Sequence, residues 1–138
     1  MARDIYHQVV REALEADGWT ITADPFVIKS IGLRLEIDLA AEQVFAAERG
    51  KEEIVVEVKS FISKSKLADF YEAKGKYDTY KYGLMETPID KKLYLAIEET
   101  IFNTFFQKPL IKTIVQKEHI DLIIFNNNSR RIVQWIVN

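Results

Sequence analysis

The sequence contains no cysteine, only three prolines and five glycines, and no long apolar run. The absence of cysteine excludes disulfide bonds and thiolate metal ligands. The apolar runs are far shorter than the roughly 20 residues that a helix needs to cross a bilayer. The polar residues that follow Met1 do not resemble the apolar core of a signal peptide. These absences predict a cytoplasmic protein that makes no contact with a membrane.

Positive and negative charges are nearly balanced along the chain. The 138 residues include 19 Lys and Arg against 21 Asp and Glu, which gives a net charge of -2. Because the chain is not basic overall, any contact with DNA requires a local basic patch. The length suffices for one substantial core, and the sequence has no linker, repeat or low-complexity tract. We therefore expect a single domain over residues 1–138.

Helical and strand patterns alternate along the chain, which predicts an α/β (α+β) fold. Helices are expected, from apolar spacing and end signals, over residues 4–17, 63–85, 98–106 and 109–117. Strands are expected, from β-branched or alternating patterns, over residues 19–22, 26–28, 33–38, 54–59, 93–97, 121–125 and 132–137. Residues 39–48 are ambiguous because Ala and Glu favour helix. We interpret them as a strand continuing from residue 38, since the loop after them leads as a hairpin into the next strand.

Residues 54–59, with the sequence IVVEVK, are strongly β-branched and contain one acid and one base. Side chains two residues apart point to the same face of a strand. Glu57 and Lys59 are therefore expected side by side, with Val56 and Val58 on the opposite face. A charged residue in so apolar a strand needs a partner, a metal ion or water. This pair is the first candidate for chemistry.

A second acid, Asp38, lies at the end of an earlier strand. If the two strands pair as a hairpin, Asp38 can lie opposite Glu57 and Lys59. Two neighbouring carboxylates repel each other unless a cation joins them, and Mg²⁺ is held by few carboxylates and several waters. A bound Mg²⁺ polarises a phosphoryl oxygen and activates water, while the lysine can stabilise negative charge. The set suits metal-dependent phosphodiester hydrolysis, although an E-x-K pair is also common in purely structural strands.

The sequence resembles two related groups of proteins. Residues 36–39 (EIDL) and 56–60 (VEVKS) resemble the motif of the PD-(D/E)XK, or restriction-endonuclease-like, superfamily. More closely, the chain looks like the XisH family, and the likeness covers nearly its whole length. The superfamily resemblance implies a core of helix, β-meander, helix and strand, with a mixed central sheet flanked by helices. The segments that carry the XisH likeness are residues 17–22 (DGWTIT), 38–42 (DLAAE), 57–61 (EVKSF) and 93–97 (LYLAI).

The resemblance implies roles for individual residues. Asp38 and Glu57 match the Mg²⁺-binding acids, and Lys59 matches the catalytic lysine; Ile37 stands where the superfamily often has proline. On the following helix Tyr80 matches the tyrosine of a Gln-x-x-x-Tyr motif. There Lys76 replaces the glutamine, and it can contact phosphate as a point charge.

A further group of candidates concerns DNA binding. Residues 59–82 contain six lysines against three acids, a local excess of three positive charges. This segment can face DNA phosphates, and a solvated helix face is the equally open alternative. Related nucleases place a glutamate on the first helix; His7 and Gln8 lie nearest that position here, with Glu12 one turn later. The candidate DNA-binding or site-lining residues are His7, Lys64, Lys66, Lys76 and Tyr80.

Two functions remain open from the sequence. The first is a Mg²⁺-dependent endodeoxyribonuclease, favoured by the retained acid–acid–lysine set. The second is a catalytically inactive nuclease-fold factor that binds DNA or assembles with partners in site-specific DNA rearrangement, favoured by Lys76 and the acidic charge. The XisH resemblance implies control of the excision of a developmentally regulated DNA element. The expected partners are DNA, a small XisI-like protein and, as a homodimer, a second copy of the chain.

Overall fold

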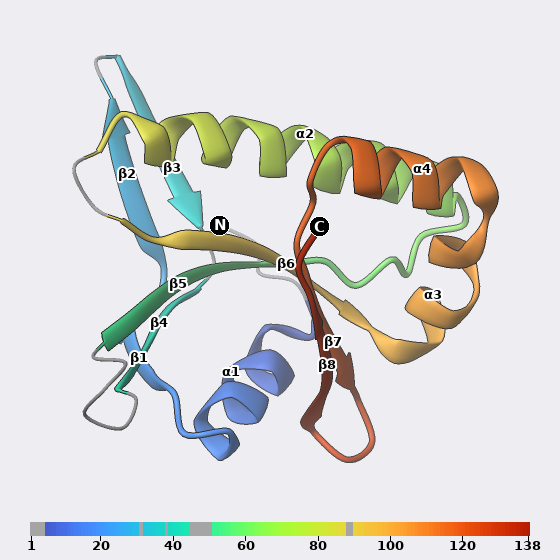
Figure 1. The fold of residues 1–138 in the computed structure, drawn as a ribbon, viewed down its shortest axis with the longest axis horizontal. Helices are drawn as coiled ribbons and strands as arrows, with labels where there is room; N and C mark the ends of the chain where they lie inside the picture. Colours follow the sequence, from blue (N-terminus) through green and yellow to red (C-terminus); the bar gives the residue numbers. More distant parts are fainter. Residues whose placement is uncertain (1–4, 31, 38, 45–50, 88–89) are drawn as a thin grey trace.

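The computed structural model describes residues 5–30, 32–37, 39–44, 51–87 and 90–138. A six-stranded sheet forms the centre, with the strand order β1-β4-β5-β6-β7-β8 (Figure 1). The strands of this sheet are β1 (Thr20–Ala23), β4 (Leu39–Val44), β5 (Lys51–Val58), β6 (Lys92–Glu98), β7 (Leu122–Asn126) and β8 (Arg131–Ile136). Strands β5, β6 and β7 run parallel, whereas β1, β4 and β8 pair antiparallel with their neighbours. The sheet is therefore mixed.

Helices cover both faces of the sheet (Figure 1). Helix α1 (His7–Ala16) lies on one face, and α2 (Lys66–Met85) and α4 (Pro109–Lys117) lie on the other. Helix α3 (Glu99–Asn103) and the short 3-10 helix η1 (Phe105–Gln107) connect β6 to α4. A separate hairpin of β2 (Phe26–Ser30) and β3 (Leu33–Ile37) stands beside the sheet.

Strand β5 contributes to two separate cores. Its residues Val56 and Val58 pack with Leu14 in the core beneath α1, whereas Val55 packs with Phe70 in the core beneath α2. The two-residue period predicts this division. Because parallel strands buried on both faces carry continuous apolar residues, the charged pair at the end of β5 stands out from its surroundings.

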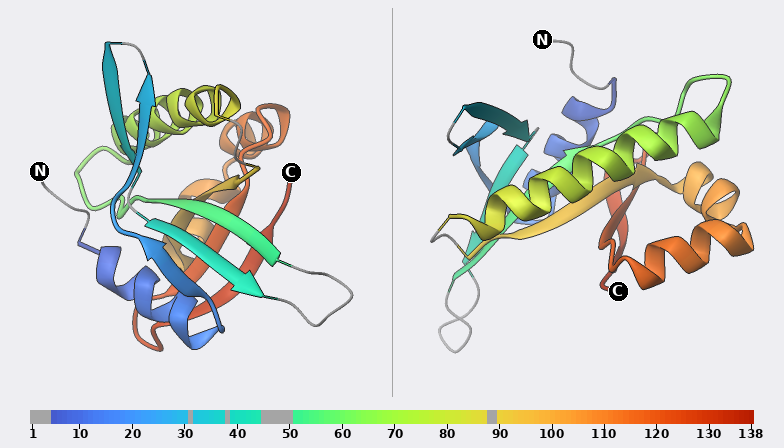
Figure 2. Two further views of the ribbon diagram at one scale, coloured as in Figure 1. Left: turned by 90° about the vertical axis from the view of Figure 1, so that its left-hand side faces the viewer. Right: turned by 90° about the horizontal axis from the view of Figure 1, so that it is seen from above.

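Helix α2 runs across the sheet from the end of β5 toward the β2–β3 hairpin, as the view from above shows (Figure 2). The hydroxyl of Ser65 accepts a 3.1 Å hydrogen bond from the amide of Ala68 and caps the helix, as expected for serine at this position. Near the other end, a Cβ added at Gly83 would lie 3.0 Å from Leu35 Cδ1. Glycine therefore lets the hairpin approach the helix closely.

The predicted α/β order of elements is confirmed, with corrections at three places. The first helix begins at His7 and not at residue 4, and Asp4 lies outside the described residues. The expected single strand over residues 33–48 is wrong, because β3 pairs with β2 while β4 pairs with β1 and β5. The expected helix over 98–106 is α3 followed by η1. Among the described residues no helix is long and apolar enough to cross a membrane.

The hydroxyl of Tyr77 joins α2 to two strands. It donates to the carbonyl oxygen of Leu93 at 3.2 Å and accepts from the amide of Asp121 at 3.1 Å. Tyr77→Phe is expected to lower the free energy of unfolding by about 1–3 kcal/mol, because it leaves two buried backbone groups without this partner. Urea unfolding at pH 7 measures the difference.

The same substitution is expected to change the stability at high pH. Burial raises the pKa of the Tyr77 phenol from 10.0 to about 12. A folded pKa above the unfolded value gives stability that is present below pH 10 and lost as the pH rises through 12. Burial also raises the pKa of Tyr94 to about 12, so Tyr77→Phe should reduce this alkaline loss without removing it. An unchanged alkaline loss in the variant would contradict the role assigned to the phenol.

Candidate functional site

Glu57 and Lys59 lie where β5 leaves the sheet. The amide of Lys59 donates to the carbonyl oxygen of Ala96 at 3.2 Å and extends the parallel pairing of β5 with β6 by one step. Glu57 is only 4% exposed and pairs in register with Leu95. Strand alternation from Val55 places both charged residues on the face that α2 covers. The expected side-by-side arrangement on one face therefore follows from the observed register.

The amine of Lys59 reaches acids on α2. Its Nζ lies 3.2 Å from Glu72 Oε2 and 3.9 Å from Asp69 Oδ1, and its side chain is 16% exposed. Glu72 Oε1 also lies 3.2 Å from Lys76 Nζ. The hydrogen bond from Lys59, followed by that from Lys76, lowers the pKa of Glu72 below its usual value. Glu72 thus stays ionised at neutral pH, and its pairs weaken only as acidification protonates it.

Buried phenylalanines fix the loop between β5 and α2. The rings of Phe61, Phe70, Phe105 and Phe106 pack with centroid separations of 5.4 to 6.0 Å. Phe61 has a left-handed backbone with φ 54°, and the amide of Ser63 donates to Asp69 Oδ2 at 3.1 Å. The aromatic cluster therefore positions α2, and with it Asp69 and Glu72, against the end of β5.

The second predicted acid, Asp38, lies outside the described residues. The backbone pairing next to it is described: Leu39 of β4 pairs with Val56 of β5, which confirms that the two strands form a hairpin. Among the described residues no three His, Asp or Glu side chains are grouped as they would be to hold a metal ion. The pairing of Asp38 with Glu57 around a cation stays a prediction.

His7 belongs to a different ion-pair cluster. It is the first residue of α1 and is buried, and its Nε2 lies 2.9 Å from Asp24 Oδ1. Arg11 Nη1 lies 2.8 Å from Asp24 Oδ2. Asp24 precedes Pro25 in the turn between β1 and β2, so this cluster ties α1 to that turn. These described contacts are structural, and a role for His7 in the Glu57 site stays a prediction.

Most of the candidate DNA-binding lysines have partners within the protein. Lys76 pairs with Glu72, and the amine of Lys66 donates to the carbonyl oxygen of Ser63 at 3.0 Å. Lys74 lies 2.9 Å from Asp78 and 3.4 Å from Glu118. Lys64 is exposed. Apart from Glu118, the acids in these pairs are those already counted against the six lysines, so the excess of positive charge remains. Several of the lysines that could face DNA phosphates are nevertheless engaged within the protein.

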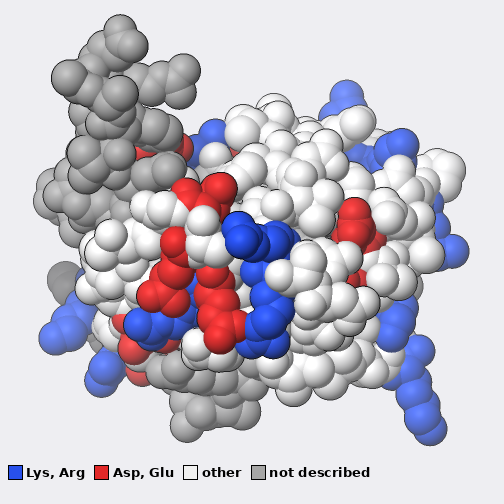
Figure 3. Space-filling view, turned by 90° about the horizontal axis from the view of Figure 1, so that it is seen from below, with Lys and Arg blue, Asp and Glu red and all other residues white. Residues whose placement is uncertain are grey.

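The tyrosines of α2 divide between core and surface. Tyr77 is buried and Tyr80 packs partly buried against the core, so neither presents an open ring to a base. Tyr71 and Tyr82 are exposed on α2 and are better placed for stacking. The opposite side of the molecule, covered by α1, carries acidic and basic groups side by side (Figure 3). Its charge is mixed, so this face is not a uniform basic surface.

Four charged residues around these sites were not selected from the sequence. Asp69 and Glu72 lie three positions apart and so share a face of α2, which is the only sequence signal for their contact with Lys59. Asp24 and Arg11 meet through a turn, and spacing carries no signal for that contact.

Comparison with known proteins gives one family and two similar structures. The family model described as XisH protein matches residues 1–133. The crystal structure of an XisH family protein from Nostoc punctiforme PCC 73102 is 38% identical, with a TM-score of 0.87, over 96% of this chain and 99% of that one. The crystal structure of an fdxN element excision controlling factor protein from Anabaena variabilis is 37% identical, with a TM-score of 0.87, over 97% and 99%. No curated protein matches the chain.

Proposed function

The chain belongs to the XisH family, and on that basis we propose that it controls the excision of a DNA element. This is the role that the name of its Anabaena variabilis neighbour states, at 37% identity over nearly the full length of both chains. The partners proposed with this role are DNA and, from the family resemblance, a small XisI-like protein.

We further propose that the end of β5 is a site of Mg²⁺-dependent phosphodiester hydrolysis on a PD-(D/E)XK scaffold. The observation that carries this proposal is the buried carboxylate of Glu57, two residues before Lys59, at the carboxyl end of a central parallel strand. In open sheets of parallel strands, most ligand sites lie beyond the carboxyl ends of the strands.

The residues at this site fit the needs of a hard cation. Glu57, and Asp38 in this proposal, would supply carboxylate oxygens, which are the ligands that Mg²⁺ prefers. When bound, the ion supplies polarisation of a phosphoryl oxygen and activation of water. Lys59, one residue beyond the end of β5, holds an ammonium group that can stabilise negative charge developing on the phosphate.

To stabilise charge on the phosphate, the ammonium group of Lys59 must leave the Glu72 carboxylate and contact a phosphate oxygen. The side chain of Glu72 is 51% exposed, whereas that of Lys59 is 16% exposed. The Glu72 carboxylate can therefore turn into solvent and leave the ammonium group to a phosphodiester anion. The Lys59–Glu72 ion pair thus positions the lysine in the free protein and does not prevent it from contacting phosphate when DNA binds.

A nicking assay tests this proposal directly. Supercoiled, linear and branched DNA are incubated with the protein in Mg²⁺ or in EDTA. We expect the wild-type protein to nick at least one form only in Mg²⁺, and Asp38→Asn to nick about 10²-fold more slowly because a metal ligand is lost. Asp17→Asn, a surface acid at the end of α1, is the matched control and should retain the activity. Equal rates for wild type and Asp38→Asn on every DNA form would refute the hydrolysis proposal.

The second candidate is a nuclease-fold factor that does not cut DNA. The observation that favours it is that Lys59, at the end of β5, pairs with Glu72 of α2, a contact that also serves to fasten α2 to the sheet. Lys76, on α2 itself, pairs with the same carboxylate. This candidate requires Asp38→Asn and Lys59→Ala to leave DNA binding and support of excision unchanged. A loss of excision in folded protein with either substitution would exclude it.

A further inference from the structure

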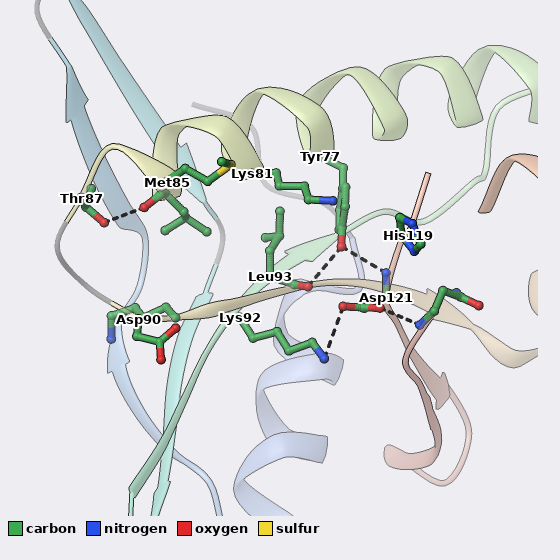
Figure 4. Close-up of a pocket in the computed structure, with 12 residues that line it drawn as sticks. Tyr77, Lys81, Met85, Thr87, Asp90, Lys92, Leu93, His119 and Asp121 are labelled. Carbon is green, nitrogen blue, oxygen red and sulfur yellow. Dashed lines mark hydrogen bonds and ion pairs between the residues drawn. The ribbon is translucent and has the colours of Figure 1, made fainter. Parts of the chain in front are cut away.

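A pocket of about 500 Å³ lies between the second half of α2, the start of β6 and the turn before β7 (Figure 4). Lys92 is the first residue of β6, and Asp121 immediately precedes β7. Because β5, β6 and β7 are parallel, this is the amino edge of the three strands. Lys59 lies beyond their carboxyl edge. The pocket is therefore separate from the site proposed above and does not depend on its chemistry.

Hydrogen bonds hold one wall of the pocket in place. Tyr77 bridges Leu93 and Asp121, as described above. The carboxylate of Asp121 also accepts from the amide of Asn138 at 2.8 Å and lies 3.5 Å from Lys92 Nζ. A wall whose polar groups already have partners is preorganised, so a ligand does not have to order it.

Two lysines place positive charge at the end of the pocket where Tyr77 contacts Asp121. Figure 4 shows Lys81 on α2 and Lys92 on β6 pointing toward the Tyr77–Asp121 contact from opposite sides. Within the part of the chain that the structure describes, the amine of Lys81 makes no ion pair. Lys92 shares its charge with Asp121 and remains 42% exposed. The two ammonium groups carry two positive charges and the Asp121 carboxylate carries one negative charge. One positive charge is therefore left to attract a second anion.

The remaining charged lining residues do not oppose an anion at this end. Lys91 already pairs with Glu53 at 3.4 Å. Asp90 lies at the opposite end of the pocket from Tyr77 (Figure 4). His119 lies near Tyr77 and adds a hydrogen-bonding ring to the lysine end. The apolar side chains that line the pocket are Leu84, Met85 and Leu93.

We propose that this pocket binds a nucleoside monophosphate group. The phosphate lies between Lys81 and Lys92, and the sugar and base lie against Leu84, Met85 and Leu93. A volume of about 500 Å³ falls within the range of small-molecule sites. The combination of an apolar wall with a few convergent charged groups is typical of such sites. The group can come from a free nucleotide or from the 5′-phosphorylated end of a DNA strand.

Isothermal titration with deoxyadenosine 5′-monophosphate tests this proposal. We expect saturable binding by the wild-type protein, and binding about tenfold or more weaker for Lys81→Met, because a charge-assisted hydrogen bond is lost. Lys29→Met removes an exposed lysine of β2 that lies outside the pocket and should bind as the wild type does. Thermal unfolding verifies that both variants are folded.

Three further titrations separate the parts of the ligand and its sources. Deoxyadenosine and inorganic phosphate should each bind more weakly than the nucleotide, and equal binding of either would overturn the proposal. A short oligonucleotide with a 5′-phosphate is compared with the same strand lacking it. Binding of the nucleotide, or of the phosphorylated strand only, supports the site and assigns its source. Absence of both, or Lys81→Met binding equal to that of the wild type, overturns it.

Discussion

Replacing Lys59 with methionine is expected to slow Mg²⁺-dependent DNA nicking by about 10²- to 10³-fold, the cost typical of removing one group that stabilises charge in a transition state. Methionine keeps much of the length of the lysine side chain, so packing against α2 changes little. The loss should appear in kcat more than in KM, because the ammonium acts on charge that develops during the reaction. Initial rates at several DNA concentrations measure the two constants.

Two control variants make the Lys59 result specific. Lys117→Met removes an exposed lysine at the end of α4 and should leave nicking unchanged. Glu72→Gln removes the nearer of the two acidic partners of Lys59 but keeps the amine, so it should retain activity. Nicking by Lys59→Met at the wild-type rate would show that this ammonium has no catalytic part.

The Phe70→Ala protein is expected to lose about 3–5 kcal/mol of the free energy of unfolding, as is usual when a buried phenylalanine is truncated. Phe70 is 1% exposed, and its ring centroid lies 5.9 Å from those of both Phe105 and Phe106. The cavity would lie between α2 and η1, where the surrounding rings are fixed by their own contacts and cannot collapse freely. Urea unfolding followed by circular dichroism measures the change.

Tyr71→Ala is the matched control for Phe70→Ala. Tyr71 is the next residue of the same helix, but it is 64% exposed, and surface substitutions usually change stability by no more than about 0.5 kcal/mol. If Phe70→Ala destabilised the protein as little as Tyr71→Ala does, the aromatic cluster would not be what holds α2 against the end of β5.

Local sequence signals predicted most of the elements because their causes are local. Pro109 supplies a favourable first helical residue, and α4 spans Pro109–Lys117 as expected. The serine cap before α2 and the β-branched run of β5 are equally short-range features. The break between β3 and β4 was missed because it depends on pairing partners: β3 joins β2, and β4 joins β1 and β5. Alternation within residues 33–48 carries no information on that change of partner.

For the candidate site, the sequence predicted which face of the strand each residue occupies, but not which residues of other elements it contacts. The two-residue period placed Glu57 and Lys59 together, but it did not show that Lys59 meets Glu72. That contact depends on how far α2 is rotated about its axis against the sheet, which the buried phenylalanines decide. The pocket beside Tyr77 was also missed, since Lys81 and Asp121 come to line it only through the packing of α2 beside β6 and β7.

Calorimetric titration of Mg²⁺ into the wild-type protein and into Glu57→Gln tests most directly whether the end of β5 is a cation site. Glutamine keeps the size of the buried side chain and removes its charge, and thermal unfolding confirms that the variant is folded. We expect one saturable Mg²⁺ site in the wild type and an affinity at least about tenfold lower in Glu57→Gln. Even the loss of a group that only hydrogen-bonds to a metal ligand typically lowers metal affinity by that factor. Identical Mg²⁺ binding by the two proteins, or no binding by either, would contradict this expectation.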